Sequence, residues 1–325
     1  MTLSQILLPI NTLQVEFEKY LNNLLDSNIQ LLRDVFNYIS DNKGKRLRPN
    51  LMLLAASALG SINEQIYDNA AMVELLHTST LIHDDIVDES LERRGKPSIN
   101  ARWNNKIAVL SGDFIISHVL RFALKNKDFK FLDICFKTIE TMTEGELLAI
   151  QQSDKVEFDE EIYYKIIFAK TASLISSCCY ISAYTATNGK SIYIENLKKY
   201  GEYVGMAFQI RDDIFDYIST SNTIGKPVGN DIKERKLTLP LIYALSKASD
   251  SKREEILSKI RAQKISTETI NEIIDFTVKS GGIDYAMKEA EKFVDKAVDC
   301  IKHIPESEAK NSLIAFAHYV IERNK

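Results

Sequence analysis

Two acidic clusters of identical spacing are the residues of this sequence best suited to chemistry. Each reads Asp-Asp-x-x-Asp, and together they comprise Asp84, Asp85, Asp88, Asp212, Asp213 and Asp216. Positions i and i+4 share one face of a helix, so each cluster presents neighbouring carboxylates at the end of an apolar stretch. Such carboxylates need a compensating cation, and oxygen ligands without histidine or cysteine favour Mg²⁺ bridging to phosphate. One cluster alone would more often be a solvated turn, but the pair predicts a diphosphate held by Mg²⁺ between two facing helices.

Basic residues near the clusters could bind the phosphate oxygens that metal ions leave free. Lys45 and Arg48 lie in a loop of turn residues that ends at Pro49, which suits the first turn of a helix. Cations at a helix N-terminus oppose the helix dipole, so they indicate an anion bound there. Arg93 and Arg94 closely follow the first cluster and could grip the same phosphates. The alternatives are a solvated basic loop and surface ion pairs.

Further polar residues stand in stretches that are otherwise apolar. His77 precedes the first cluster by seven residues, which places it on the same helical stripe. Lys170, followed by Thr171, interrupts an apolar stretch, so it either snorkels to the surface or points at the diphosphate. Gln209 lies one turn before the second cluster. A Gly/Pro-rich loop centred on Lys226 could close over phosphates as a lid or form an ordinary connection.

The elements that position these residues are expected to be helices. Only 12 Gly and 6 Pro punctuate 325 residues, and no segment sustains the alternation of a strand. Gly145 inside a helical pattern indicates the close approach of another helix or a ligand. We expect two helices or a broken one over 12–40, and further helices at 49–59, 73–89, 101–127, 131–152, 162–186, 205–217, 251–260, 266–280, 285–301 and 307–323.

Charge and composition exclude several classes of function. The net charge of −4, without a dominant basic patch, argues against nucleic acid as a partner. The N-terminus lacks the basic region of a signal peptide, and no apolar stretch is expected to be long enough to span a bilayer. The four cysteines show no metal-ligand spacing and fit a cytoplasmic, reduced protein.

The order and spacing of these motifs resemble the trans-isoprenyl diphosphate synthases, also called the polyprenyl synthetase family. The resemblance runs from about Gly44 to Pro240 and continues into a helical tail. It is carried by Gly-Lys-Arg-Leu-Arg-Pro at 44–49, His77, the two acidic clusters, Arg93-Arg94, Lys170-Thr171, Gln209 and Gly-Lys-Pro at 225–227. The family usually has two glycines before the lysine of the basic loop, and here Lys43 replaces the first.

The resemblance implies one all-α domain over residues 1–325, a helical bundle around a deep central cavity, usually dimeric. It implies Mg²⁺ and two substrates, an allylic diphosphate and isopentenyl diphosphate. The allylic diphosphate and its metal ions would be held by Asp84, Asp88, Asp212, Asp213, Asp216, Arg93, Lys170, Thr171, Gln209, Lys226 and Lys236, with Asp85 a further catalytic residue. Isopentenyl diphosphate would lie on Lys45, Arg48, His77 and Arg94.

The chemistry of this reaction agrees with the residues present. Release of diphosphate requires neutralisation of its negative charge, which Mg²⁺, lysine and arginine provide. The allylic cation must be kept from water, which an apolar cavity does. The double bond of isopentenyl diphosphate then attacks and a proton is lost, for which the family's departing diphosphate is a suitable base.

Residues one turn before the first cluster bear on product length. Ser79 and Thr80 are expected to point along the cavity, where an aromatic residue would stop growth early. Their small size lets the product extend at least one helical turn deeper, about 5.4 Å, towards Met72, Val73 and Leu76. We therefore expect an all-trans product of about thirty to fifty carbons, suited to a quinone side chain. The alternatives are that small residues merely ease packing and that the product is farnesyl or geranylgeranyl diphosphate.

Two rival classes are less consistent with the motifs. A terpene cyclase typically mixes Asn, Ser and Glu in its second metal motif and would not need the basic loop. A non-catalytic partner subunit would be expected to lose carboxylates, and both clusters are complete. We expect a homodimer that contacts membranes peripherally for product release. A catalytic subunit that needs a small regulatory partner stays an alternative.

Overall fold

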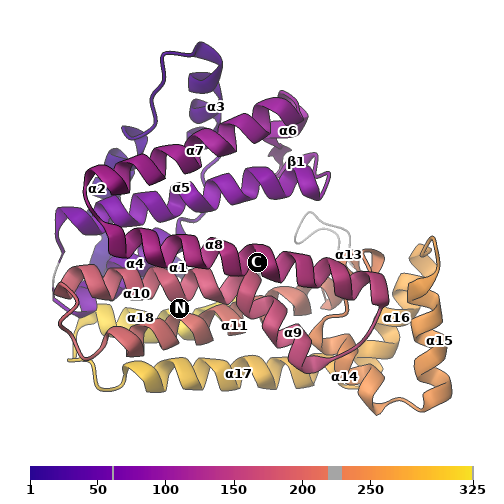
Figure 1. Cartoon of the computed structure of the whole chain (residues 1–325). Coiled ribbons are helices and arrows are strands. Elements are labelled where there is room, and N and C mark those ends of the chain that lie inside the picture. Colours follow the sequence, from indigo (N-terminus) through magenta and orange to yellow (C-terminus); the bar gives the residue numbers. More distant parts are fainter. Residues whose placement is uncertain (61, 219–228, 324–325) are drawn as a thin grey trace. The chain divides into compact units, whose positions relative to one another are not determined.

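The computed structural model describes residues 1–60, 62–218 and 229–323, and almost all of its regular structure is helical (Figure 1). The chain divides into two compact units. Unit 1 comprises Met1–Phe136, Cys178–Glu195 and Ile304–Leu313, and unit 2 comprises Lys137–Ser177, Asn196–His303 and Ile314–Lys325. The first acidic cluster and the basic loop lie in unit 1, whereas the second cluster and Lys170 lie in unit 2.

The first half of the chain forms the helices that carry the basic loop and the first cluster. They are α1 (Leu3–Ile6), the 3₁₀ turn η1 (Leu8–Ile10), α2 (Asn11–Asn22), α3 (Gln30–Asp41), α4 (Leu47–Ala58), α5 (Glu64–Val87), α6 (Ile99–Arg102) and α7 (Asn105–Lys125). A short antiparallel pair, β1 (Glu92–Arg93) and β2 (Lys96–Pro97), lies between α5 and α6. The predicted segment 12–40 is thus two helices, α2 and α3.

The remaining helices carry the second cluster and its surroundings. They are α8 (Phe129–Lys155), α9 (Glu160–Ile167), the π-helical turn η2 (Phe168–Ala172), α10 (Ser173–Thr187), α11 (Ile194–Ile218), α13 (Asn230–Lys233), α14 (Leu239–Lys247), α15 (Asp250–Arg261), α16 (Thr267–Lys279), α17 (Gly282–Ile301) and α18 (Glu308–Glu322). The prediction of an all-α fold is confirmed. The helix expected over 162–186 is interrupted by η2, and such π-turns are frequent at functional sites.

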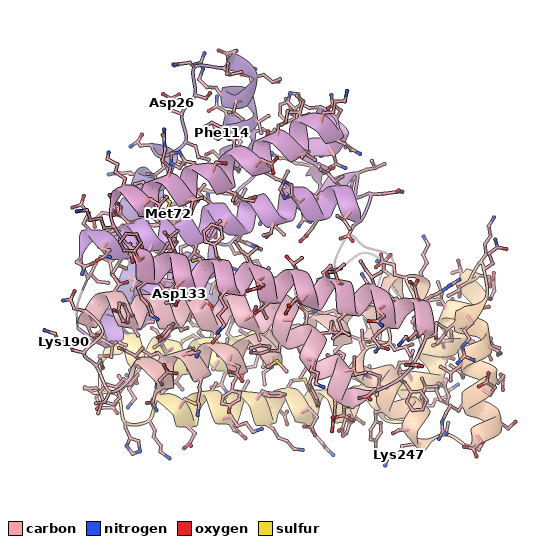
Figure 2. All side chains as sticks on the ribbon, in the orientation of Figure 1. Asp26, Met72, Phe114, Asp133, Lys190 and Lys247 are labelled. Carbon is pink, nitrogen blue, oxygen red and sulfur yellow. The ribbon has the colours of Figure 1, made fainter. Side chains whose placement is uncertain are left out.

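Helix α5 is the central element of unit 1. Its start is fixed by Asn63, whose side-chain oxygen accepts a hydrogen bond from the Ile66 amide at 3.1 Å, an interaction of about 1 kcal/mol. It packs along α7, where a Cβ added to Gly112 would lie 2.2 Å from His83 Nε2. Figure 2 labels Met72 on α5 and Phe114 on α7. This close packing fixes the direction in which α5 carries the first cluster at its C-terminal end.

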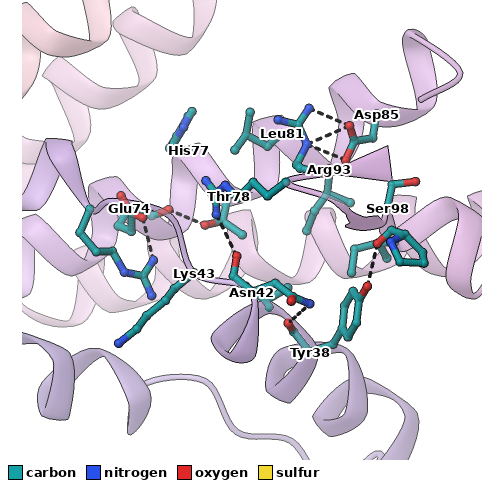
Figure 3. A pocket seen from close by; sticks show the side chains of 16 residues that line it. Tyr38, Asn42, Lys43, Glu74, His77, Thr78, Leu81, Asp85, Arg93 and Ser98 are labelled. Atoms are coloured by element: carbon teal, nitrogen blue, oxygen red, sulfur yellow. Dashed lines mark hydrogen bonds and ion pairs between the residues drawn. The ribbon is translucent and has the colours of Figure 1, made fainter. Parts of the chain in front are cut away.

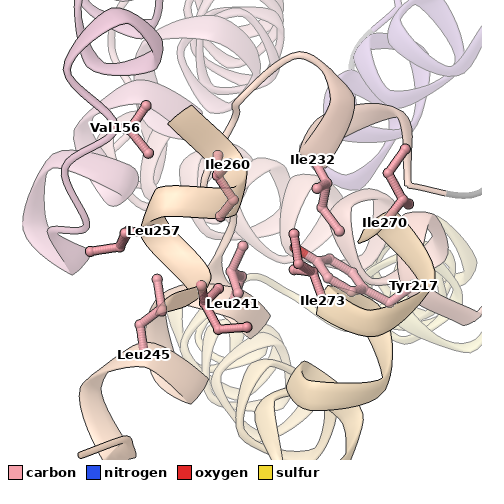
Figure 4. Close-up of a cluster of buried hydrophobic side chains, with 10 residues drawn as sticks. Val156, Tyr217, Ile232, Leu241, Leu245, Leu257, Ile260, Ile270 and Ile273 are labelled. Atoms are coloured by element: carbon pink, nitrogen blue, oxygen red, sulfur yellow. The ribbon is translucent and has the colours of Figure 1, made fainter. Parts of the chain in front are cut away.

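A cluster of buried apolar side chains packs around the end of α11 in unit 2 (Figure 4). Tyr217, one residue past the second acidic cluster, is 5% exposed and packs with Ile232 of α13 and Leu241 of α14. Gly145 of α8 lies against η2, because a Cβ there would be 2.3 Å from the Cβ of Ala169. The close approach predicted at Gly145 is therefore confirmed. These contacts position α11 and η2, which carry the polar residues of unit 2.

Two helical stretches among the described residues have the length and hydropathy of a membrane span. They are Asn105–Lys125, with a mean hydropathy of 1.6, and Glu160–Thr187, with 1.4. The expectation that no apolar stretch is long enough was therefore wrong. In Glu160–Thr187, 72% of the most apolar segment is buried inside the protein, as in a core helix of a globular fold. In Asn105–Lys125, only 33% of the most apolar segment is buried.

Candidate active site

The first acidic cluster lies at the C-terminal end of α5, and its three aspartates differ in environment. Asp84 and Asp88 are exposed, whereas Asp85 is 2% exposed. Arg93 binds the Asp85 carboxylate through Nε at 2.9 and 2.8 Å and through Nη2 at 2.7 Å (Figure 3). The negative end of the helix dipole adds to the charge of the exposed carboxylates. Asp84 and Asp88 are therefore placed to attract a cation, while Arg93 contacts Asp85, and its predicted role on a phosphate stays a prediction.

The start of α4 and α5 bring together two buried nitrogen atoms that lack hydrogen-bond partners. Arg48 Nε and His77 Nδ1 are buried and have no hydrogen-bond partner among the described residues. Burial lowers the pKa of the Arg48 guanidinium. Burial also lowers the pKa of His77 well below its ordinary value, and the positive charges of Arg48 and Arg94 lower it further. Buried donors without acceptors are costly, and a bound anion would relieve both the missing hydrogen bonds and the repulsion.

Arg94 lies in the turn between β1 and β2, and its side chain contacts the basic loop. Its Nη1 donates to the Asn42 carbonyl oxygen at 2.9 Å. A Cβ added to Gly44 would lie 2.6 Å from Arg94 Nη2, so glycine is required for the guanidinium to lie against the loop. The structure thus places Arg48, His77 and Arg94 in one region of unit 1, as predicted, with Lys45 exposed on the same loop. Their role in binding isopentenyl diphosphate is not tested by these contacts.

In unit 2 a chain of hydrogen bonds joins the π-turn η2 to the second cluster. Thr171 Oγ1 donates to Gln209 Oε1 at 2.7 Å, and Gln209 Nε2 donates to Asp213 Oδ1 at 2.8 Å. The Tyr163 hydroxyl donates to Asp213 Oδ2 at 2.7 Å. Burial raises the pKa of Asp213 well above its ordinary value, and the negative charge of Asp231 raises it further. A cation near Asp213 would offset this burial of negative charge.

The other two aspartates of the second cluster have structural contacts. Asp216 accepts hydrogen bonds from the amides of Gly229, Asn230 and Asp231 at 3.2, 3.1 and 2.9 Å, which caps the start of α13. Asp212 binds the guanidinium of Arg323. Carboxylates accept at several lone pairs, so both can still bind a metal ion. Their assignment as metal ligands stays a prediction.

A pocket of about 200 Å³ in unit 2 gathers several of the predicted residues. Its lining includes Lys170, Gln209, Asp213, Asp231 and Lys236. Lys170 Nζ lies 2.6 Å from Glu146 Oε2, and Lys236 Nζ lies 2.6 Å from Glu234 Oε2. Lys170 therefore reaches polar surroundings at the surface of η2. Lys226 lies outside the described residues.

Sequence reasoning missed several residues that hold these groups. Tyr163 precedes Lys170 by seven residues, so it shares a helical face with it, and this spacing could have revealed it. Asp231 lines the pocket. Its pKa is raised to about 7, mainly by burial and further by the negative charge of Asp216. Arg323 lies 111 residues from Asp212 in the sequence, and no local pattern indicates that contact.

Four of the five chain-length candidates on α5 are buried, and Thr80 is half-buried. Ser79 is fully buried, and its hydroxyl donates to the Gly112 carbonyl oxygen on α7 at 3.1 Å. The Thr80 hydroxyl donates to the His77 carbonyl oxygen at 2.9 Å. Met72 lines a pocket of about 700 Å³ near the start of α5, and Val73 and Leu76 are buried. Ser79 therefore faces α7, and the effect of these residues on product length stays a prediction.

The donor set fits a metal ion that is shared with a substrate. Within residues 1–60, 62–218 and 229–323, no group of three or more His, Cys, Asp or Glu side chains forms a ready-made metal cage. Mg²⁺ is commonly bound by one or two carboxylates together with phosphate oxygens and water, and needs no such cage. The exposed Asp84 and Asp88 suit this mode of binding.

Comparison with known proteins places the chain in a family. A model of the polyprenyl synthetase family matches residues 29–277. The chain is 36% identical over 320 residues to an all-trans-nonaprenyl-diphosphate synthase (geranyl-diphosphate specific) of Rhodobacter capsulatus, covering 98% of this chain and 97% of that one. It is 35% identical over 300 residues to the octaprenyl diphosphate synthase of Haemophilus influenzae, covering 92% and 91%. The chain therefore belongs to the polyprenyl synthetase family.

A solved structure supports the same assignment. The polyprenyl synthase from Caulobacter crescentus, in complex with calcium and isoprenyl diphosphate, matches with a TM-score of 0.90 and 28% identity, covering 100% of this chain and 98% of that one. The predictions of the family, of the all-α fold and of a prenyltransferase are confirmed.

Proposed function

We propose that this chain joins isopentenyl diphosphate to an allylic diphosphate by Mg²⁺-dependent, repeated head-to-tail condensation. The chain is a prenyltransferase of the long-chain all-trans polyprenyl class, as its family and relatives indicate. The observation that carries the mechanism is in unit 1, where Arg48 Nε and His77 Nδ1 are buried without a hydrogen-bond partner among the described residues, which suits a diphosphate. The second substrate would use the acidic clusters.

The allylic substrate reacts by loss of its diphosphate. The bond between C1 and oxygen breaks, and its electron pair leaves with the diphosphate. Mg²⁺, when bound, neutralises the charge that develops on this leaving group. We assign metal binding to Asp84, Asp88 and Asp212. Lys170 and Thr171 would hold the phosphate oxygens, with Thr171 oriented by its hydrogen bond to Gln209.

Isopentenyl diphosphate supplies the nucleophile. Lys45, Arg48 and Arg94 would hold its diphosphate, with His77 donating a hydrogen bond from its neutral ring. Its double bond attacks C1 of the allylic cation, a new carbon–carbon bond forms, and a proton leaves the adjacent carbon for the departed diphosphate. The product is an allylic diphosphate that is five carbons longer, so the cycle repeats until the apolar space is full.

We propose a homodimer, which would cover an apolar face of α7. Val109, Leu110, Leu120 and Leu124 are 41%, 64%, 39% and 49% exposed. These residues recur at helical spacing along one side of α7, and such exposed apolar surfaces mark interaction sites. Light scattering on the purified protein tests this proposal. A monodisperse monomer at micromolar concentration would contradict it.

The remaining assignments are also proposals. One catalytic domain is supported by the family match over 29–277, which includes residues of both units. A cytoplasmic location is supported by Cys135, Cys178, Cys179 and Cys300, which are all free thiols. We assign a product of about thirty to fifty carbons for a quinone side chain. The similarity to nonaprenyl and octaprenyl diphosphate synthases supports this length.

One assay tests the proposed function. The purified chain alone is incubated with Mg²⁺, labelled isopentenyl diphosphate and geranyl, farnesyl or geranylgeranyl diphosphate, and the products are sized. We expect products longer than twenty carbons. Products that end at geranylgeranyl diphosphate support the shorter-chain alternative, and activity that appears only with an added small subunit supports the regulatory-partner alternative.

A further inference from the structure

Arg46 ends the basic loop after Lys45 and precedes the first turn of α4, which contains Arg48. The proposed binding of isopentenyl diphosphate does not use Arg46. Its backbone is left-handed, with φ 51° and ψ 37°, at the N-cap of α4. This conformation is unfavourable for a residue with a Cβ, and it persists only where the surroundings hold it. The contacts of the Arg46 side chain show what holds it.

Two carboxylates from different helices clamp the Arg46 guanidinium. Nε lies 3.1 Å from Glu18 Oε1 on α2, and Nη1 lies 2.7 Å from Glu74 Oε1 on α5. The side chains of Arg46 and Glu74 are 12% and 8% exposed, and that of Glu18 is 25% exposed. Charge-assisted hydrogen bonds at this depth are strong and directional. Figure 3 shows Glu74 with its contacts on α5.

A second set of contacts ties the same loop to α2. Gln14 Nε2 donates to Asn50 Oδ1 at 2.8 Å, and Asn50 Nδ2 donates to the Lys45 carbonyl oxygen at 3.3 Å. Asn50 is 4% exposed. Helix α2 therefore supports the backbone on both sides of Arg46.

Lys43, where the family usually has glycine, joins this group. Its Nζ lies 3.1 Å from Glu18 Oε2, the second oxygen of the carboxylate that binds Arg46. The Lys43 side chain is 53% exposed, so its pair with Glu18 contributes little. Lys43 therefore offers a variant that changes charge near Glu18 without removing the clamp.

We propose that Arg46 is a positioning residue of the isopentenyl diphosphate site. Clamped between Glu18 and Glu74, it holds the left-handed turn that directs Lys45 and Arg48 towards the diphosphate. This inference rests on the proposed function. Because Glu18 lies on α2 and pairs with Lys43 and Arg46 of the loop, its loss should affect binding of isopentenyl diphosphate alone.

The test compares Glu18→Gln, Arg46→Lys and Arg46→Gln with the wild type in the full chain. We expect Glu18→Gln to raise KM for isopentenyl diphosphate on the order of tenfold, because misplaced binding groups lose affinity steeply. KM for the allylic diphosphate should stay within about twofold. Calorimetric binding of isopentenyl diphosphate without allylic substrate should weaken in the same ratio. Arg46→Lys should recover part of the loss in Arg46→Gln.

Controls separate positioning from a general loss of stability. Arg261→Gln breaks an exposed pair with Glu254 on α15, 2.8 Å between Nη1 and Oε1, and should leave both KM values unchanged. Lys43→Ala should do the same. Glu18→Gln combined with Arg46→Gln should be no worse than Arg46→Gln alone, since both break one interaction.

The outcomes distinguish the two proposals. A wild type that neither binds nor condenses isopentenyl diphosphate overturns the proposed function, and the role of Arg46 with it. An active wild type whose Glu18→Gln variant keeps its KM for isopentenyl diphosphate overturns the role of Arg46 alone. Equal rises in both KM values would also contradict positioning of one substrate.

Discussion

Substitution of Ser79 by phenylalanine should shorten the product, and the structure gives the size of the perturbation. Ser79 is fully buried on α5, and its hydroxyl donates to the Gly112 carbonyl oxygen at 3.1 Å. The α5–α7 contact is already tight there, because a Cβ on Gly112 would lie 2.2 Å from His83 Nε2. A phenyl ring is too large for this contact with α7, so we expect it to turn away from α7 and to block the space into which the product grows. Overpacking of this kind costs about 1–3 kcal/mol of folding stability.

The assay sizes the products of Ser79→Phe against those of the wild type and Ser79→Ala. Ser79→Ala removes only the hydroxyl, which is worth about 0.5–1.5 kcal/mol, and should keep the product length. Ser79→Phe should release products at least one isoprene unit shorter and should melt at a lower temperature. A Ser79→Phe variant that folds, is active and makes products of unchanged length would refute the gating role of this position.

Three further predictions follow from the contacts described above. Tyr163→Phe removes the donor to Asp213 and should lower kcat/KM for the allylic diphosphate. The loss should correspond to about 1.5–3 kcal/mol of transition-state stabilisation. The control is Tyr164→Phe, which removes a hydroxyl that donates to Glu160 Oε1 at 3.0 Å. Equal effects in both variants would contradict the role of Tyr163. The pKa of His77 is lowered by burial, so the unfolded chain binds the proton more readily. Stability should therefore be lost as pH falls through the unfolded pKa of about 6.5, by at most about 1.4 kcal/mol per pH unit. Thermal melts between pH 5 and 7.5 should show this slope, and His77→Gln but not the exposed His303→Gln should reduce it. Chelation of divalent ions should abolish product formation and addition of Mg²⁺ should restore it, whereas activity that persists in excess chelator would exclude a role for the carboxylates as metal ligands.

Much of the site could be predicted from sequence because helical geometry is local. The spacing of each Asp-Asp-x-x-Asp cluster fixes which carboxylates are neighbours on α5 and α11. Gln209 lies one turn before the second cluster, and the structure shows its side chain bonded to Asp213 four residues later. The position of His77 above the first cluster follows from the same 3.6-residue period.

The partners of these residues could not be predicted in the same way. Arg93 was assigned to a phosphate and contacts Asp85 in the structure, eight residues away across a turn. The expected absence of a membrane-length apolar stretch was wrong, because a helix of a globular fold can be as long and as apolar as a membrane span, as in Glu160–Thr187, where 72% of the apolar segment is buried. Ser79 was expected to face a cavity, but in the structure it contacts α7. The direction that its side chain faces depends on where the neighbouring helix packs.

The sequence alone determined the family, the helical class and the residues that carry charge towards a diphosphate, because these depend on residue type and on spacing within one helix. The tertiary structure decided which of those charges are already bound by the protein. Glu18 meets Arg46 across 28 residues, and Arg323 meets Asp212 across 111. Such contacts exist only after helices far apart in the sequence have packed, and no local period encodes them.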